Sequence, residues 1–359
     1  MIWWLAGCLM LVLVCRPEAA ESMWTLVRQL RESITGNSAL VRDPDPAYEI
    51  YQRYRYAYDT YGYLFLSANG DGDGMSVQEE AAAKTADAGT AAAAGEVSGI
   101  QAAGSLPSFA QLEDYDYLMK HFYSVHPSTT APRELMKAEK FLGKDLRLEK
   151  DPAVPQILIY HTHSQETYAD YGPSNPEATV VGVGNYLTEI LQNKGWNVIH
   201  DVSTYDIQGG SLDRNRAYTY ALEGVERILR EHPSIQVVLD LHRDGVRENV
   251  RLVSEVNGKQ TANVMFFQGM SRTPEGEIDY LPNPNLEGNL AFAFQMQFVA
   301  AGDFPGLTRK IYLKGLRYNL HVRERAALIE VGAQTNTGEE ARNAMEAVGE
   351  VLDRVLQGF

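Results

Sequence analysis

The sequence predicts an α/β protein with a mostly parallel, twisted sheet flanked by helices. From about residue 154 to the C-terminus, short apolar segments alternate with amphipathic segments of ten or more residues. Two of the long segments stop at Gly195 and Pro233, residues that are typical of helix ends. Strands that alternate with helices of this length form parallel sheets, because each helix carries the chain back to the starting edge.

The elements of this region are predicted one by one from their hydrophobic pattern. Strands are expected where apolar and β-branched residues cluster, and helices where apolar residues recur with a period near 3.6. The expected strands are 156–160, 196–201, 235–244 and 263–269, with a last strand and turn at 325–337. The expected helices are 180–195, 212–233, 286–304 and 338–359. Together they define a predicted domain at 154–359.

The first part of the chain is less regular, and four segments are expected there. Residues 1–20 contain a short apolar run that suits an export signal or a membrane anchor, a buried strand or helix being the alternative. Residues 21–67 are rich in tyrosine and are expected to form a small β or helical unit. Residues 68–105 are mostly Ala, Gly and small polar residues, which predicts a flexible linker. Residues 106–153 are expected to form a helical lead-in.

Charge and cysteine content exclude several functions. The formal net charge is −15, and the sequence has no basic block of the kind that binds phosphate backbones, so nucleic acid is not an expected partner. The two cysteines, Cys8 and Cys15, both lie in the first apolar segment. The body of the protein therefore has no thiolate ligand and no cysteine nucleophile. A metal bound there must be held by His, Asp or Glu.

Histidine and glutamate collect where three of the predicted strands end. The first strand is followed by His161 and His163, and Glu166 comes just after them. Another strand ends around His242, and the last one contains Glu330. Ligands of parallel sheets bind at the carboxyl ends of the strands, so these residues are expected to meet at one edge.

This set of residue types suits catalytic zinc. A catalytic zinc site uses three protein ligands, often two His and one Glu, and leaves one position for water or substrate. A further carboxylate can take the proton of the attacking water and pass it to the leaving nitrogen. Each residue also has a structural alternative, because a lone histidine is usually a packing residue and Glu330 could pair with Arg323 or Arg325. In a strand, His161 and His163 point to the same face, so spacing alone leaves both as candidates.

Four motifs together resemble a known family. They are "ILIYHTHSQETY", "LDLHRDG", "RYNLH" and "LIEVGAQTNTGEEA", which occur in this order between about Val154 and Phe359. As a set they are similar to the stage II sporulation protein P family, which is related to the zinc-dependent N-acetylmuramoyl-L-alanine amidases. The resemblance implies an amidase-like catalytic domain at 154–359 that binds Zn²⁺.

The resemblance also implies which residues hold the metal. The amidases have a Gly-His-Gly motif at the end of the first strand, and its ligand matches His163; because the glycines are absent here, His161 remains an alternative. The second ligand is a glutamate, which matches Glu166, with Glu177 as the alternative before the next helix. The third ligand is a histidine at a strand end and matches His242.

The catalytic residue implied by the family is a glutamate in an E-x-G-F-x-S-N motif, which matches Glu330 in "EVGAQTN". Ala333 and Thr335 stand where the motif has Phe and Ser, so details of the pocket differ. Arginine side chains bind carboxylates through a two-pronged contact. Three arginines are therefore weaker candidates for binding the carboxylates of the stem peptide: Arg243, Arg309 and Arg317.

The function implied by the resemblance is hydrolysis of peptidoglycan at the amide between the muramic acid lactyl group and L-alanine. Cleavage of peptide crosslinks is a second implied activity. The family also implies membrane anchoring through the N-terminal segment, a location between the two membranes of a sporulating cell, and engulfment proteins as partners, among them a lytic transglycosylase. Two alternatives remain: another zinc-dependent peptidase or carboxypeptidase of the cell envelope, and a non-catalytic scaffold that binds the cell wall.

Overall fold

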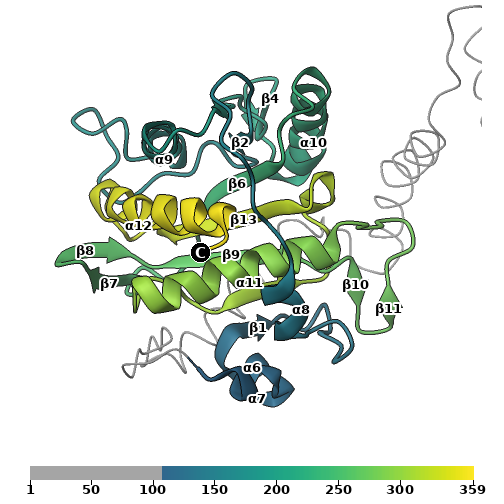
Figure 1. Cartoon of the computed structure of the whole chain (residues 1–359). Helices are drawn as coiled ribbons and strands as arrows, with labels where there is room; N and C mark the ends of the chain where they lie inside the picture. Colours follow the sequence, from purple (N-terminus) through teal and green to yellow (C-terminus); the bar gives the residue numbers. More distant parts are fainter. Residues whose placement is uncertain (1–106) are drawn as a thin grey trace, which may run out of the picture. The chain divides into compact units, whose positions relative to one another are not determined.

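The computed structural model describes residues 107–359 (Figure 1). The predictions for residues 1–105, including the signal or anchor, the tyrosine-rich unit and the linker, lie outside the described residues. Among residues 107–359, no helix is long and apolar enough to cross a membrane.

Helices and strands alternate along the described chain, as the hydrophobic pattern predicts. The helices are α6 (Phe109–Glu113), α7 (Tyr115–Phe122), α8 (Ala138–Gly143), α9 (Val180–Asn193), α10 (Arg214–Glu231), α11 (Leu286–Asp303), the 3₁₀ helix η2 (Leu320–Val322) and α12 (Gly338–Gln357). The strands of the main sheet are β1 (Tyr123–Val125), β2 (Ile157–Tyr160), β3 (Val198–His200), β6 (Val237–Asp244), β9 (Val264–Gly269), β12 (Ile311–Lys314) and β13 (Arg325–Ala333). Three hairpins are made by β4 (Ile207–Gln208) with β5 (Ser211–Leu212), β7 (Val253–Val256) with β8 (Lys259–Ala262), and β10 (Arg272–Thr273) with β11 (Gly276–Glu277).

Local sequence signals set the ends of the last helix. The Thr337 side chain accepts a hydrogen bond from the backbone N–H of Glu340, and the Glu340 side chain accepts one from Thr337 N–H. This reciprocal pair satisfies two donors that the first helical turn leaves open. At the other end, Gly358 has φ 93°, the left-handed conformation that commonly ends helices. The start of α12 is therefore fixed just beyond β13.

The seven strands form one sheet in the order β1-β12-β9-β13-β6-β2-β3. β13, β6, β2 and β3 are parallel to one another, and so are β1, β12 and β9. The two groups meet between β9 and β13, which are antiparallel, with Phe267 opposite Leu328. The prediction of a mostly parallel sheet is confirmed. The carboxyl ends of β2, β6 and β13 consequently lie at the same edge.

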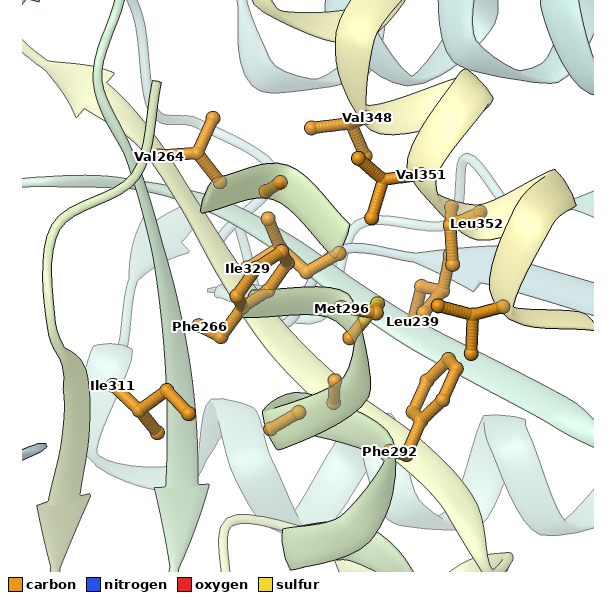
Figure 2. Packing of buried hydrophobic residues seen from close by; sticks show 14 of the residues in the cluster. Leu239, Val264, Phe266, Phe292, Met296, Ile311, Ile329, Val348, Val351 and Leu352 are labelled. Carbon is orange, nitrogen blue, oxygen red and sulfur yellow. The ribbon is translucent and has the colours of Figure 1, made fainter. Parts of the chain in front are cut away.

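Helices cover both faces of the sheet. On one face, α9, α11 and α12 pack their apolar residues against alternate residues of the strands in one continuous core. Figure 2 shows part of this core, in which Phe266 and Ile329 from the sheet meet Val351 from α12 and Met296 from α11. On the other face, Val225 and its neighbours on α10 pack against a second cluster that includes residues of β2, β6, β9 and β13. The result is a three-layer α/β/α arrangement.

The segment before residue 154 belongs to the same core. It contains α6, α7 and α8, as the expected helical lead-in would, and also the strand β1 at the edge of the main sheet. Phe122 and Tyr123 lie against Phe294 of α11, with ring centroids 5.2 and 6.4 Å apart. β1 and β12 are not among the strands predicted from the sequence.

A large-to-small substitution in the core tests the packing described above. Phe266 on β9 is fully buried, so Phe266→Ala is expected to lower the free energy of unfolding by about 3–5 kcal/mol, through lost apolar burial and the cavity left behind. Tyr171→Ala removes an aromatic ring that is 54% exposed and should change stability by no more than about 0.5 kcal/mol. Urea unfolding of both variants measures the difference, and equal effects would contradict this account of the core.

Candidate metal centre

A tight turn after β2 brings the first two candidate ligands together. The backbone N–H of Glu166 donates to the carbonyl of His163 at 3.2 Å. A bond between residues i and i+3 closes a β-turn, so the side chains at its two ends lie side by side. Further along, Val180 N–H donates to Glu166 O, which ties the turn to the start of α9. The spacing of the "HSQE" motif is therefore explained by the turn.

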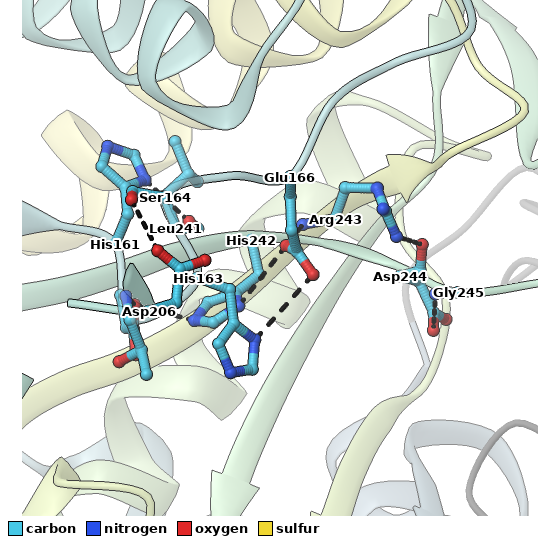
Figure 3. Close-up of polar contacts among 12 residues, drawn as sticks. His161, His163, Ser164, Glu166, Asp206, Leu241, His242, Arg243, Asp244 and Gly245 are labelled. Atoms are coloured by element: carbon cyan, nitrogen blue, oxygen red, sulfur yellow. Dashed lines mark hydrogen bonds and ion pairs between the residues drawn. The ribbon is translucent and has the colours of Figure 1, made fainter. Parts of the chain in front are cut away.

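His163, Glu166 and His242 converge at the edge where β2 and β6 end (Figure 3). His163 Nδ1 lies 3.9 Å from Glu166 Oε1, and His242 Nδ1 lies 3.6 Å from Glu166 Oε2. One ligand atom from each residue lies within 4.8 Å of the other two. Two ligands of a tetrahedral zinc lie about 3.4 Å apart, since each bond is about 2.0–2.2 Å long. The three side chains therefore need only a small contraction to hold one ion.

Asp240 orients His242 from behind. Its Oδ1 lies 2.8 Å from His242 Nε2, which leaves Nδ1 of the ring turned toward Glu166. The Asp240 carboxylate is itself fixed by Thr162, whose N–H and Oγ1–H donate to it at 2.9 and 2.6 Å. A carboxylate that holds the second nitrogen of a histidine is the usual support of a metal-ligating imidazole.

The protonation states of His163 and Glu166 fit a cation. Burial, with a contribution from the charge of His242, lowers the pKa of His163 to about 4, so its imidazole is neutral near pH 7. Burial alone would raise the pKa of Glu166, but contacts with His242 and His163 outweigh it and lower the pKa. His163 Nε2 is buried without a hydrogen-bond partner, and Nδ1 is the nitrogen of this ring that faces Glu166. Neutral imidazole and ionised carboxylate are the forms that bind zinc.

The first alternative ligand, His161, lies in a different network. Its Nδ1 contacts the carbonyl of Leu241 at 2.8 Å, and its Nε2 contacts Nε2 of His200 at 2.8 Å. His200 in turn contacts Asn185 at 3.0 Å. A Cβ at Gly184 would lie 2.7–2.8 Å from both rings, so glycine makes room for the pair. The structure thus places His161 away from the cluster of His163.

The second alternative ligand, Glu177, is exposed and lies outside the cluster. Its carbonyl accepts the N–H of Thr179, the residue that caps α9. A Cβ at Gly182 would lie 2.1 Å from that same carbonyl oxygen. Glu177 therefore stands at the entry to the helix, while Glu166 is 3% exposed and faces both histidines.

Glu330 lies on β13 directly beside His242 on β6, in register with it. Adjacent strands are about 4.8 Å apart, and two residues in register point to the same face of the sheet. Burial, with the nearby charge of Asp244, raises the pKa of Glu330 to about 8. Its Oε2 is buried without a hydrogen-bond partner. A cation at the cluster would lower this pKa again, which leaves a carboxylate able to accept and return a proton.

An irregularity in β13 fixes the direction of this glutamate. The pairing of β13 with β6 shifts register between Glu330 and Ala333, and Gly332 within it has φ 57°. A side chain there would be strained and would also lie 2.7 Å from Asn336 Oδ1. Asn336 is fully buried and accepts the N–H of Ala333 while donating to Leu252 O and Glu340. Gly332 and Asn336 of the "EVGAQTN" motif therefore have structural roles in placing Glu330.

The three candidate arginines have intramolecular contacts. Arg243 donates from its side chain to the carbonyls of Thr167 and Asp244, both at 3.1 Å, and from its backbone N–H to Glu166. Arg309 pairs with Asp244 at 2.5 Å. The charge of Asp244 raises the pKa of Glu330, and the charge of Arg309 lowers it. Arg317 donates to the carbonyl of Pro282 at 3.4 Å. Of the three, Arg309 lowers the pKa of Glu330 through its charge, and Arg243 holds the carboxylate of Glu166 through its backbone N–H.

Three residues near the cluster were not predicted from sequence. Asp240 could have been found, because it stands two positions before His242 in a strand and so shares its face. Arg214 lies 3.5 Å from Glu166 Oε1, and the ring of Tyr218 lies 5.6 Å from that of His163. Both come from the first turns of α10. No local pattern connects them to the cluster, because only the packing of α10 on the sheet brings them there.

The fold and the site together define an α/β protein with a His-Glu-His cluster and a partly buried glutamate at the carboxyl ends of its strands. Residues 80–353 match the family described as Stage II sporulation protein P (SpoIIP), and the chain belongs to this family. The Stage II sporulation protein P of Bacillus subtilis (strain 168) is 26% identical over 285 residues, which cover 70% of this chain and 68% of that protein.

One similar solved structure is the CwlD amidase from Clostridioides difficile in complex with the GerS lipoprotein. The alignment covers 56% of this chain and 95% of the chain of that structure. The sequence identity is 12% and the TM-score is 0.37. The N-acetylmuramoyl-L-alanine amidase AmiC2 of Nostoc punctiforme aligns with 56% of this chain and 94% of its own, with 13% identity and a TM-score of 0.34. At TM-scores this low, nothing about activity follows from the likeness.

Metal analysis of two histidine variants separates the cluster from its neighbours. His163→Ala removes one ligand, and its zinc content should fall from about one ion per chain to near zero. His200→Ala changes a histidine of the adjacent network and should keep the zinc. Zinc in purified protein is measured by mass spectrometry after dialysis against metal-free buffer. Retention of zinc by His163→Ala would contradict the proposed cluster.

Proposed function

We propose that the protein is a zinc-dependent N-acetylmuramoyl-L-alanine amidase that hydrolyses peptidoglycan during sporulation. The observation that carries this proposal is the meeting of His163, Glu166 and His242 beside Glu330, a glutamate whose pKa is raised by burial. Membership of the Stage II sporulation protein P family supports the sporulation role. Export, membrane attachment and partnership with other engulfment proteins, including a lytic transglycosylase, form part of the same proposal.

The proposed chemistry divides between the ion and the protein. Bound zinc supplies Lewis acidity, which polarises a carbonyl and makes water more acidic. Glu330 accepts a proton from the attacking water and then donates it to the departing nitrogen. The water oxygen becomes part of the lactyl carboxylate, and the stem peptide leaves with a free amine on its L-alanine. His163, Glu166 and His242 hold the ion, while Asp240 keeps the ring of His242 in position.

The proposed amidase differs from its alternatives in its products. Purified muropeptides, incubated with the zinc-loaded protein, should release intact stem peptides that begin with L-alanine. A carboxypeptidase would release single residues from the other end of the stem, and an endopeptidase would separate crosslinked stems without freeing them from the glycan. Chromatography with mass spectrometry distinguishes these products. Release of no stem peptide by zinc-loaded protein would contradict the proposed activity.

Glu330→Gln separates catalysis from metal binding. The amide keeps the size of the side chain but cannot take up the proton, so kcat/KM on muropeptides should fall by about 10²–10⁴-fold, the usual contribution of a general acid–base group. Zinc content should stay at the level of the unchanged protein. Glu324→Gln is the matched control, since Glu324 lies just before β13 and pairs instead with Lys144. Full activity of a zinc-loaded Glu330→Gln protein would overturn the role given to this residue.

A further inference from the structure

Asp206 is a buried carboxylate that contacts the ligand-bearing turn. It is fully buried, in the loop that precedes the β4–β5 hairpin. Its Oδ1 accepts a hydrogen bond from the hydroxyl of Ser164 at 2.9 Å (Figure 3). Its Oδ2 accepts one from the backbone N–H of Gln165 at 3.2 Å. Ser164 and Gln165 are the two middle residues of the turn that has His163 and Glu166 at its ends. One carboxylate therefore fixes both central residues of this turn.

The β4–β5 hairpin connects Asp206 to a second contact with the same turn. The base of the hairpin is closed by Asp213 N–H, which donates to Asp206 O at 2.7 Å. The next residue, Arg214, begins α10 and places Nη1 3.5 Å from Glu166 Oε1. Asp206, just before the hairpin, thus contacts the middle of the turn, and Arg214, two residues after the hairpin, contacts its glutamate.

The base of the hairpin is anchored, whereas its outer end is exposed. α10, which starts at Arg214, packs on the sheet through buried residues such as Ala221 and Val225. At the outer end of the hairpin, the turn residues Gly209 and Gly210 are exposed. The contacts with the turn therefore come from the part of the hairpin that is joined to the core.

We propose that Asp206 and Arg214 are positioning residues of the metal centre, which hold His163 and Glu166 at the separation that one ion requires. The outer contacts of metal ligands orient them, and their loss usually lowers metal affinity about 10–100-fold. This proposal rests on the proposed function in one respect, namely that the His-Glu-His cluster binds zinc. It assigns a role to the hairpin, which the family motifs do not include.

The test is the zinc affinity of an Asp206→Asn variant. Asparagine has one acceptor oxygen and one amide donor, so it cannot accept bonds from both Ser164 and Gln165 through separate oxygens. Competition with a zinc-binding dye should show a dissociation constant at least about ten-fold higher than that of the unchanged protein. Substitution by cobalt gives a second measure, because its visible spectrum reports the arrangement of the ligands. Thermal unfolding of the metal-free protein is measured in parallel and should change little.

Two further variants complete the experiment. Arg214 lies on α10, outside the buried loop of Asp206, and Arg214→Met removes its contact with Glu166. This variant should also weaken zinc binding. It keeps the proposal testable if Asp206→Asn does not fold. Asp201→Asn is the matched control: Asp201 lies in the same loop, but it accepts bonds from Ser203 and Tyr205 and not from the turn. Its zinc affinity should be unchanged.

The outcomes distinguish this proposal from the proposed function. If the unchanged protein does not bind zinc, the metal centre itself is wrong and the positioning role falls with it. If the unchanged protein binds zinc and both Asp206→Asn and Arg214→Met bind it equally well, only the positioning role is overturned. Weaker binding by the two variants, with affinity kept in Asp201→Asn, supports the role.

Discussion

The arrangement of the site depends on one buried histidine between two buried carboxylates. His242 lies 2.8 Å from Asp240 and 3.6 Å from Glu166, and all three side chains are almost fully buried. Burial alone would lower the pKa of His242, yet the two carboxylates raise it well above its ordinary value. Two negative charges at this depth require a positive charge near them. Without an ion, the proton on His242 supplies that charge; with an ion, the ring is free to become a neutral ligand.

Because these buried charges must be kept close together, many contacts of the structure hold the side chains of the site in place. The turn carries two candidate ligands, His163 and Glu166, and the irregularity at Gly332 immediately follows Glu330 on β13. Neither the turn nor the strand irregularity is strong by itself, because each depends on a few hydrogen bonds. Both are supported by groups from distant parts of the chain, such as Asp206 and Asn336. The site is therefore a product of the folded domain and not of its motifs alone.

Much of the fold could be predicted from sequence because its long elements carry strong periodic signals. The helices α9, α10, α11 and α12 and the strands β2, β6, β9 and β13 all appear where the hydrophobic pattern indicated. The β7–β8 hairpin is not among the predicted elements, although its "NG" turn, with positive φ at Asn257 and Gly258, is a strong sequence signal for a hairpin. The reversal of direction between β9 and β13 had none, because strand direction depends on the path of the intervening chain. In the site, spacing indicated His163, Glu166 and His242, but the separation of His161 from them required the three-dimensional structure.

The edge strand β1 has a consequence for how the protein can be divided. β1 pairs with β12 through Tyr123, Ser124 and Val125, and Phe122 and Tyr123 lie against Phe294. A fragment that started at residue 154 would leave β12 with open backbone donors and acceptors, a form of edge that recruits other chains, and would uncover aromatic rings on α11. A fragment that contains the candidate metal centre and does not self-associate should therefore begin before α6, and shorter fragments should self-associate even with every residue of this candidate centre present.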